Sequence, residues 1–153
     1  MRRTVSGYAQ VGAAGVMIED QVAPKRCGHT GVKAVVGRSE AVARVRAACD
    51  ARDETAAATG GAGVVIVART DANAALGFDE AVERCRLFRE VGADVTFLEA
   101  PRSVEEMAAY CAADPGWKLA NMLEGGLTPI LPPDELGKMG YTLAASFAAR
   151  IIS

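Results

Sequence analysis

The residues best suited to chemistry follow a short apolar run, Val16–Ile18. Two carboxylates, Glu19 and Asp20, end that run, and the loop that follows contains the stretch Lys-Arg-Cys-Gly-His at 25–29. Positive charges beside a cysteine favour its thiolate and lower its pKa, so Cys27 is a candidate acid or base. A glutamate at the end of a buried strand needs a cation or hydrogen-bond donors to offset its lost hydration.

Plainer interpretations of the same loop remain open. Cys27 would then be an inert loop cysteine, and Lys25 an exposed surface lysine. In a functional loop, Lys25 would help to close a lid over a substrate and exclude water. His29, the only histidine in the chain, would orient the loop or the thiol through a hydrogen bond, or transfer a proton.

Length and composition exclude several classes of function. The 153 residues suffice for one domain with a sizeable core, and a net charge of −2 gives no basic footprint for nucleic acid. No run approaches the roughly 20 apolar residues of a membrane span, and no apolar signal segment follows the N-terminus. We therefore expect an intracellular protein, cytoplasmic or organellar and not secreted, whose four widely spaced cysteines are reduced.

The hydrophobic pattern predicts alternating strands and helices, as in a parallel α/β sheet. Strands are expected at Val16–Ile18, Val64–Ala68, Val95–Leu98, Trp117–Ala120 and Tyr141–Ala144. Helices are expected at Thr4–Val11, Ser39–Ala51, Asp79–Val91, Ser103–Ala113, Pro133–Gly140 and Ser146–Ile152. Ser39 and Ser103 are candidate N-caps, and the Ala/Thr/Gly stretch Thr55–Gly63 is predicted to be a flexible linker.

Polar side chains lie at the carboxyl end of each of the first four predicted strands. They are Glu19, Arg69 with Asp71, Glu99 and Asn121. The carboxyl ends of parallel strands share one edge of a sheet, where ligands bind, so these residues predict a site. Arg69 can hold a carboxylate in its planar fork, or it can form a structural ion pair with Glu19, Asp71 or Glu99. The plain alternative is a set of ordinary strand-end residues that meet solvent.

The motifs together resemble the isocitrate lyase/phosphoenolpyruvate mutase superfamily. The resemblance rests on Gly15–Gln21 with Pro24–His29, then Val67–Ala72, Leu98–Ala100 and Asn121–Gly126, in the family's order. The Lys-Arg-Cys-Gly-His stretch points to the lyase branch, because mutases usually lack the cysteine. The later segments resemble most closely the plant-type members labelled carboxyvinyl-carboxyphosphonate phosphorylmutase. The resemblance covers nearly the whole chain and fades after about Thr142.

The resemblance implies a (β/α)8 TIM barrel, a fold that needs about 250 residues. The five predicted strands correspond to the fourth to eighth of that barrel. The first three strands, the family's swapped C-terminal helix and its magnesium-anchoring Asp-x-Asp segment have no counterpart in this sequence. We therefore expect residues 1–153 to form a partial, N-terminally truncated barrel domain.

The resemblance also implies an activity. Lyases of the superfamily cleave a C–C bond in a small 2-hydroxy or 2-oxo carboxylate, such as a 2-alkylmalate, methylisocitrate or oxaloacetate, with Mg²⁺ or Mn²⁺. In this sequence Cys27 would be the acid/base, aided by Lys25, His29 and Arg69, and Glu19 would hold the metal through water. The implied substrate contacts are Arg69, Glu99, Asn121, Gly28 and Thr128.

Two other functions stay open. The chain could follow the mutases or hydrolases, with a carboxyphosphonoenolpyruvate phosphonomutase-type activity. It could instead be catalytically inert, because without the Asp-x-Asp ligands its binding of magnesium is in doubt. Because the family forms homo-oligomers and an open sheet has two unpaired edges, self-association or pairing with full-length subunits is then expected.

Overall fold

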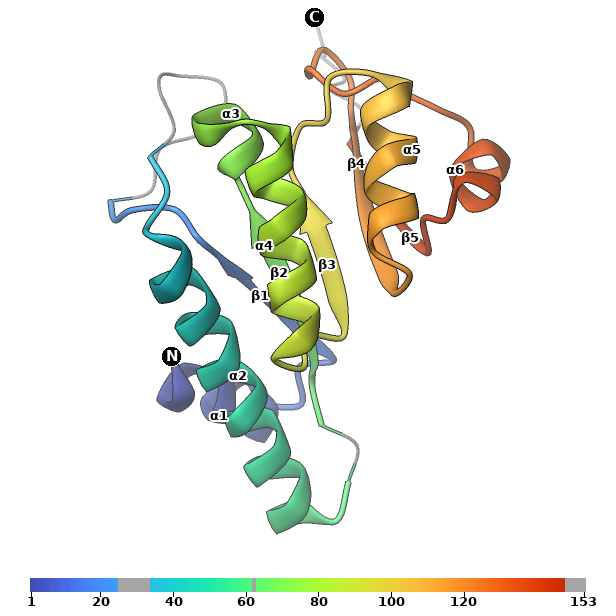
Figure 1. Cartoon of the computed structure of the whole chain (residues 1–153). Coiled ribbons are helices and arrows are strands. Elements are labelled where there is room, and N and C mark those ends of the chain that lie inside the picture. The colour runs from blue at the N-terminus through green and yellow to red at the C-terminus, as the bar shows by residue number, and fades with distance from the viewer. Residues whose placement is uncertain (25–33, 62, 148–153) are drawn as a thin grey trace, which may run out of the picture.

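The computed structural model describes residues 1–24, 34–61 and 63–147 as a mixed α/β structure. The helices are α1 (Arg2–Gln10), α2 (Arg38–Thr59), α3 (Ala72–Leu76), α4 (Phe78–Glu90), α5 (Val104–Ala113) and α6 (Pro133–Met139). The strands are β1 (Gly15–Glu19), β2 (Val65–Thr70), β3 (Val95–Leu98), β4 (Trp117–Leu123) and β5 (Leu143–Phe147). The predicted alternation of strands and helices is therefore confirmed (Figure 1).

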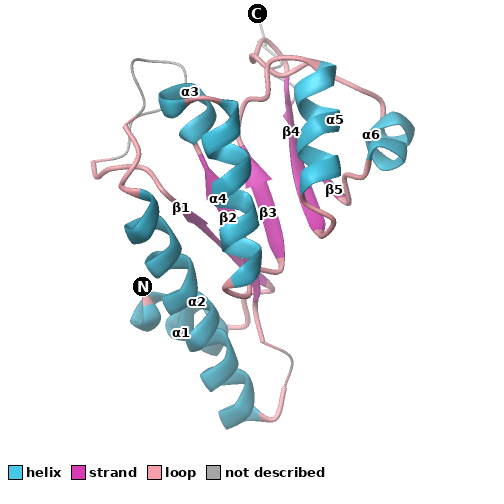
Figure 2. Cartoon of the chain, in the orientation of Figure 1, coloured by secondary structure: helices cyan, strands magenta, loops and turns pink. Residues whose placement is uncertain are grey.

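The strands form one sheet in the order β1-β2-β3-β4-β5, and every neighbouring pair is parallel. Strands that follow each other along the chain are thus also neighbours in the sheet, which is the progression of a βα barrel. The structure confirms the expected fold class, a partial α/β barrel. The long helices α2, α4 and α5 lie in front of the sheet in the view of Figure 2.

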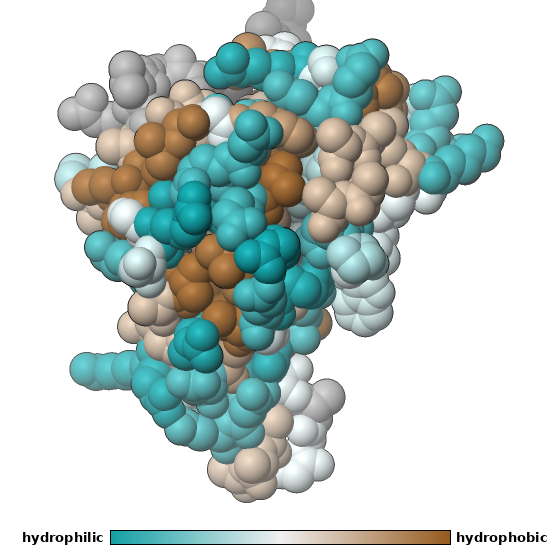
Figure 3. Space-filling model, viewed as in Figure 1, coloured by the Kyte–Doolittle hydropathy of each residue, from teal (hydrophilic) through white to brown (hydrophobic). Residues whose placement is uncertain are grey.

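Two apolar clusters join these helices to the sheet. One packs α1 and α2 against β1 and β2, around Val45 and Ile66. The other packs α4, α5 and α6 against β3 and β4, around Met107 and Tyr110. Over the helices that face the viewer, hydrophobic patches alternate with hydrophilic side chains (Figure 3).

The opposite face of the sheet is less well covered. The pairing Met17–Val67–Val95–Trp117 places these four residues in one row across the first four strands. Of these, Met17 is 46% and Trp117 59% exposed, although parallel sheets are normally buried on both faces. This face is thus exposed at the β1 and β4 positions of the row, whereas Val95 between them is fully buried.

The predicted linker Thr55–Gly63 is wrong, because α2 continues to Thr59. Alanine is the best helix former, and the hydroxyls of Thr55 and Thr59 bond to carbonyls four residues earlier, at 2.8 and 2.9 Å. The helix ends at Gly60, whose left-handed φ of 63° suits glycine. The predicted cap at Ser39 is also wrong, since α2 begins at Arg38 with Gly37 as its N-cap.

Other boundaries also differ from the predictions. In α1 only Val5 is buried, while Tyr8 and Val11, expected on a buried face, are 52% and 80% exposed. The short helix α3 was not predicted. Strand β5 includes Ser146, which was expected to begin a helix. Among the described helices, none is long and apolar enough to cross a membrane.

Candidate active site at the carboxyl ends of the strands

Arg69, the penultimate residue of β2, is the centre of a polar cluster. Its Nε and Nη2 atoms donate to the two carboxylate oxygens of Asp71 at 3.0 and 2.9 Å. Its Nη1 lies 3.5 Å from Glu99 Oε2, and its Nε lies 3.8 Å from Glu19 Oε2. The guanidinium carbon lies 5.1 Å from the centre of the Phe97 ring. The structure therefore brings together the predicted polar ends of three strands.

The sheet register explains this convergence. Glu19 pairs with Arg69, and Arg69 pairs with Phe97, so their side chains point to the same face. Burial disfavours the charged guanidinium, but the hydrogen bonds to Asp71 and the nearby carboxylates of Glu99 and Glu19 outweigh it and raise the pKa of Arg69. Arg69 is thus a permanent cation, 15% exposed, held among acids.

Asn121 extends the cluster to β4 and leaves it incomplete. Its Nδ2 lies 3.4 and 3.5 Å from the two Glu99 oxygens, which are long hydrogen bonds. Its Oδ1 is buried and has no hydrogen-bond partner among residues 1–24, 34–61 and 63–147. Buried acceptors without a partner are rare, so this atom marks a place where a further donor fits.

A strained residue fixes Glu99. The next residue, Ala100, has a φ of 57°, a left-handed conformation that costs about 1 kcal/mol outside glycine. The Asn73 amide donates to Ala100 O at 2.8 Å, and Glu99 N donates to Thr70 O at 3.0 Å. Sequence reasoning missed Asn73, because an asparagine at the start of a short helix carries no distinctive pattern.

A buried carboxylate, Asp20, was also missed as a site residue. It is 2% exposed and accepts hydrogen bonds from Thr70 Oγ1, Asp71 N and Arg84 Nη1. The sequence drew attention to Asp20 only as the second carboxylate after an apolar run. Arg84 lies in the middle of α4, in the stretch expected to supply an apolar face.

Several predicted site residues have no described position. Lys25, Cys27, Gly28 and His29 lie outside the described residues, so their predicted roles stay predictions. Thr128 is half-buried, and within the described chain no hydrogen bond joins it to Arg69, Glu99 or Asn121. In the turn that follows β4, Gly126 N donates to Leu123 O at 3.0 Å, so this N–H is not available to a ligand.

The polar cluster contains carboxylates, the ligands that suit magnesium. Among the described residues, three acids, Glu19, Asp71 and Glu99, lie around one cation, Arg69, and carboxylates attract metal cations. However, all three carboxylates lie within 4 Å of Arg69 nitrogens, and among residues 1–24, 34–61 and 63–147 no three His, Cys, Asp or Glu side chains are placed to hold a metal ion. These residues alone therefore do not fit a magnesium site.

Three of the four cysteines can be assigned to the core. Cys49, Cys85 and Cys111 are buried and form no disulfide, as the sequence predicted for them. Burial raises the pKa of Cys49 and of Cys111 to about 11 and also raises the pKa of Cys85. Buried thiols of raised pKa are poor acid/base groups at neutral pH, so these three are structural.

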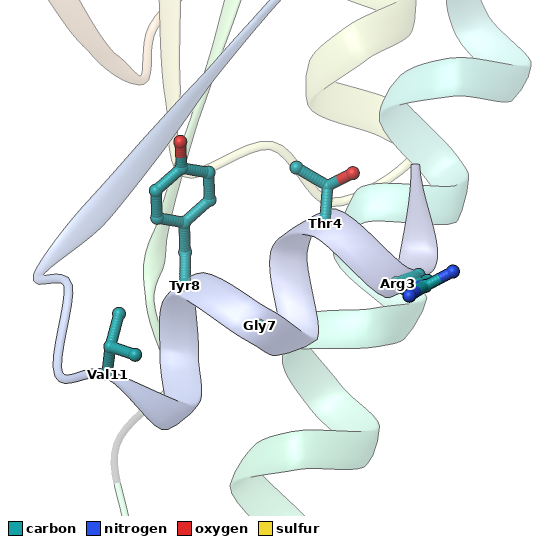
Figure 4. A pocket seen from close by; sticks show the side chains of 5 residues that line it. All are labelled: Arg3, Thr4, Gly7, Tyr8 and Val11. Carbon is teal, nitrogen blue, oxygen red and sulfur yellow. The ribbon is translucent and has the colours of Figure 1, made fainter.

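A shallow hollow of about 370 Å³ lies elsewhere, along α1. Figure 4 shows Thr4 and Tyr8 projecting from the same side of this helix, with Arg3, Gly7 and Val11 completing the lining. None of these residues belongs to the Arg69 cluster. The hollow offers only a phenol, a hydroxyl and one arginine, so we do not place a catalytic site there.

The fold and the cluster together define a partial βα barrel with polar residues at the carboxyl ends of its strands. The profile of the phosphoenolpyruvate phosphomutase family matches residues 1–149. The chain therefore belongs to this family, within the isocitrate lyase/phosphoenolpyruvate mutase superfamily.

Individual relatives agree with this assignment. The chain is 43% identical over 141 residues to 2,3-dimethylmalate lyase of Eubacterium barkeri, a match that covers 92% of this chain and 46% of the relative. It is 42% identical over 145 residues to petal death protein of Dianthus caryophyllus, covering 95% and 43%. A solved structure of oxaloacetate acetylhydrolase with the inhibitor 3,3-difluorooxalacetate superposes with a TM-score of 0.83 at 42% identity, covering 94% of this chain and 47% of that one. The chain thus spans less than half the length of these relatives.

Proposed function

We propose that this chain carries part of the active site of a lyase that cleaves a C–C bond in a small 2-hydroxy or 2-oxo carboxylate. The carrying observation is the convergence of Arg69, Glu99 and Asn121 at the carboxyl ends of three strands, where Asn121 Oδ1 lacks a partner within the described part of the chain. The names of the related 2,3-dimethylmalate lyase and oxaloacetate acetylhydrolase support a substrate of this class.

Arg69 is the proposed carboxylate-binding group. Asp71 occupies its Nε and Nη2 atoms, and the one contact of Nη1 with a described residue is that to Glu99, at 3.5 Å. A substrate carboxylate or oxo group can accept a hydrogen bond from Nη1, while a substrate hydroxyl can donate to Asn121 Oδ1. A 2-hydroxy carboxylate supplies both kinds of atom on adjacent carbons.

The charge of the cluster shows what else the site needs. An anionic substrate beside Glu19, Asp71 and Glu99 requires more positive charge than Arg69 provides. We propose that Lys25 and Arg26 supply part of it, and that Gly28 and Thr128 add hydrogen bonds. The remainder would come from Mg²⁺ or Mn²⁺, held by ligands beyond the described residues with Glu19 as a helper through water. A bound divalent cation would stabilise negative charge on substrate oxygens.

Cys27 is the proposed acid. When the C–C bond breaks, its electron pair stays on the departing carbon, which then takes a proton from the Cys27 thiol. The substrate hydroxyl, which in a 2-oxo substrate is supplied by addition of water to the carbonyl, gives its proton to solvent water as its C–O bond becomes a carbonyl. The Cys27 thiolate takes a proton back from solvent, so charge and atoms balance. His29 and Lys25 would orient the thiol and close the loop over it. The three other cysteines are buried in the core, which leaves Cys27 as the thiol for this role.

A fusion protein tests this proposal. The N-terminal half of the E. barkeri lyase is placed before residue 1, and cleavage of oxaloacetate and 2-alkylmalates is assayed with Mg²⁺. We expect turnover in the fusion, and a loss of at least about 100-fold in its Cys27→Ser variant, the scale of general acid catalysis. The control is Cys49→Ser, which changes a thiol that is 3% exposed. No turnover in the unchanged fusion, or full turnover in Cys27→Ser, would contradict the proposal.

A further inference from the structure

Asp20 is tied to the residues around Arg69 through both of its carboxylate oxygens. Its Oδ1 accepts from the backbone N–H of Asp71 at 2.9 Å. Its Oδ2 accepts from Thr70 Oγ1 at 2.6 Å and from Arg84 Nη1 at 2.9 Å. The side chain is 1% exposed, so these contacts replace water almost completely.

Arg84 brings the compensating charge from helix α4. It is 1% exposed, and its Nε donates to Glu80 Oε1 at 2.8 Å. Glu80 in turn pairs with Arg38 at the start of α2. A buried ion pair is weak evidence for stability, because packed apolar residues of similar volume can replace such a pair without loss. The retention of two buried charges here therefore calls for another role.

The contacts of Asp20 lead directly to Arg69. The Asp71 N–H that Asp20 holds belongs to the residue whose carboxylate grips Arg69 at two nitrogens. Thr70 Oγ1, while donating to Asp20, accepts from Ala72 N at 3.1 Å and so fixes the turn into α3. Two successive residues that follow Arg69 are thus held by one carboxylate.

The backbone of Asp20 lies beside the start of the segment that contains Cys27. Asp20 O accepts from Val36 N at 2.9 Å, and Gln21 O accepts from Arg44 Nη1 at 3.1 Å. Val22 N donates to Ala34 O at 2.9 Å. The backbone of Asp20 therefore contacts the residues that flank this segment, and its side chain contacts the residues that hold Arg69.

We propose that Asp20, neutralised by Arg84, is a positioning residue that sets the orientation of the Arg69 guanidinium through the backbone of Asp71. The inference rests on the proposed function in one respect, that Arg69 contacts substrate. Asp20 itself, being buried behind Thr70 and Asp71, acts only through them.

A control is provided by Asp94, which contacts the amino end of strand β2. The Asp94 carboxylate accepts from Ile66 N at 2.8 Å and from Arg52 Nη1 at 2.7 Å. Asp94 thus holds one arginine and one backbone N–H at the amino end of β2, whereas Asp20 holds one arginine and the N–H of Asp71, just after the carboxyl end of β2. Loss of Asp94 charge should disturb β2 without reaching Arg69.

The test is hydrogen exchange of the Arg69 Nε–H group, followed by NMR in the 153-residue chain. The signal is assigned by its disappearance in Arg69→Lys. We expect Asp20→Asn to speed this exchange at least about tenfold, because the hydrogen bonds from Arg69 to Asp71 would open more often. We expect Asp94→Asn to change the exchange rate by no more than about twofold. Unchanged exchange in a folded Asp20→Asn chain would overturn the proposal.

Two further variants keep the test decisive. If Asp20→Asn does not fold, Thr70→Val removes one donor to Asp20 at nearly constant volume, and we expect exchange about threefold faster. Unchanged exchange there would equally overturn the proposal. In the double variant Asp20→Leu with Arg84→Met, an apolar pair replaces the charges. Slow Nε–H exchange in that folded variant would show that Asp20 serves packing only.

This readout requires no catalysis. If Asp20→Asn speeds exchange of the Arg69 Nε–H group while the fusion protein shows no turnover, the positioning role stands and the proposed function fails. If the fusion protein is active and Asp20→Asn leaves the Arg69 Nε–H exchange rate unchanged, the proposed function stands and the positioning role fails.

Discussion

The two ends of the parallel sheet each bury an arginine among polar groups, but only one end is left incomplete. At the amino end, Arg89 donates to both oxygens of Asp114, to Thr96 Oγ1, and to three carbonyls including Trp117 O at 2.7 Å. At the carboxyl end, counting only the residues that the structure describes, Arg69 Nη1 has a single contact at 3.5 Å, and Asn121 Oδ1 has no partner. Completed hydrogen bonding indicates a structural cluster, and incomplete bonding indicates a site.

The presence of a surface hollow does not show which end of the sheet is the site. One of about 320 Å³ lies at the amino end, lined by Arg89, Asp94 and Trp117 among others. The charged groups that line it are already engaged, because Arg89 donates to both oxygens of Asp114, and Asp94 accepts from Arg52 Nη1 at 2.7 Å and from Ile66 N at 2.8 Å. The availability of hydrogen bonds, and not the shape of the surface, therefore supports the proposed site at the carboxyl end.

The largest effect on stability is expected at the completed end. Asp114 is 2% exposed and accepts from Arg89, Thr96 and Gly116 N. Asp114→Asn should lower the free energy of unfolding by about 3 kcal/mol, because it leaves the buried part of Arg89 without its counter-charge. Urea unfolding of the purified chain measures this change. A loss below about 1 kcal/mol would mean that the amino end is not the structural cluster described here.

A smaller, pH-dependent effect is expected from Glu80, which supports Arg84 at the carboxyl end. Hydrogen bonds from Arg38 and Arg84 lower the pKa of Glu80 to about 2, from 4.5. With the folded-state pKa depressed, the stabilisation is present above pH 4.5 and is lost as the pH falls toward 2. Glu80→Gln should therefore flatten the loss of stability between these pH values, measured by urea unfolding at several pH values. Parallel curves for the two proteins would contradict this.

The smallest effect is expected at the start of α5, after Glu99. The Ser103 hydroxyl accepts from Glu106 N at 3.2 Å and caps the helix. Ser103→Ala should cost about 1 kcal/mol of stability. Ser39→Ala is the control, because Ser39 lies inside α2 and caps nothing. Thermal unfolding of both variants measures the difference, and equal midpoints would show that the Ser103 cap contributes nothing.

Much of the fold follows from local patterns in the sequence. The β-branched run Val64–Ala68 and the spacing of its neighbours predicted the parallel sheet, because continuous apolar runs fit strands buried on both faces. The Ala/Thr run at the end of α2 was misread as a linker, since small residues signal flexibility only when glycine dominates. The Thr-to-carbonyl bonds and the Gly60 cap that define its end arise from local geometry.

The site was predictable only where its residues follow strands. Glu19, Arg69, Glu99 and Asn121 were identified because strand ends share an edge in any parallel sheet. Asp20 and Arg84 were not identified as partners, since 64 residues separate them and only helix packing joins them. Arg84 also faces inward from a helix stretch that was expected to bury apolar side chains. The roles of Cys27, Lys25 and His29 stay predictions.

The comparison of the two ends is tested most directly by matched substitutions in the fusion protein, Arg69→Lys and Arg89→Lys, with turnover per folded molecule and unfolding midpoint measured for each. A lysine keeps the charge but loses the planar fork. We predict that Arg69→Lys loses at least about 100-fold in turnover with a nearly unchanged midpoint, since oriented charge in a site contributes on this scale. Arg89→Lys should lower the midpoint and keep turnover. The reverse pattern, or equal turnover in both variants, would contradict the assignment of the carboxyl end as the site.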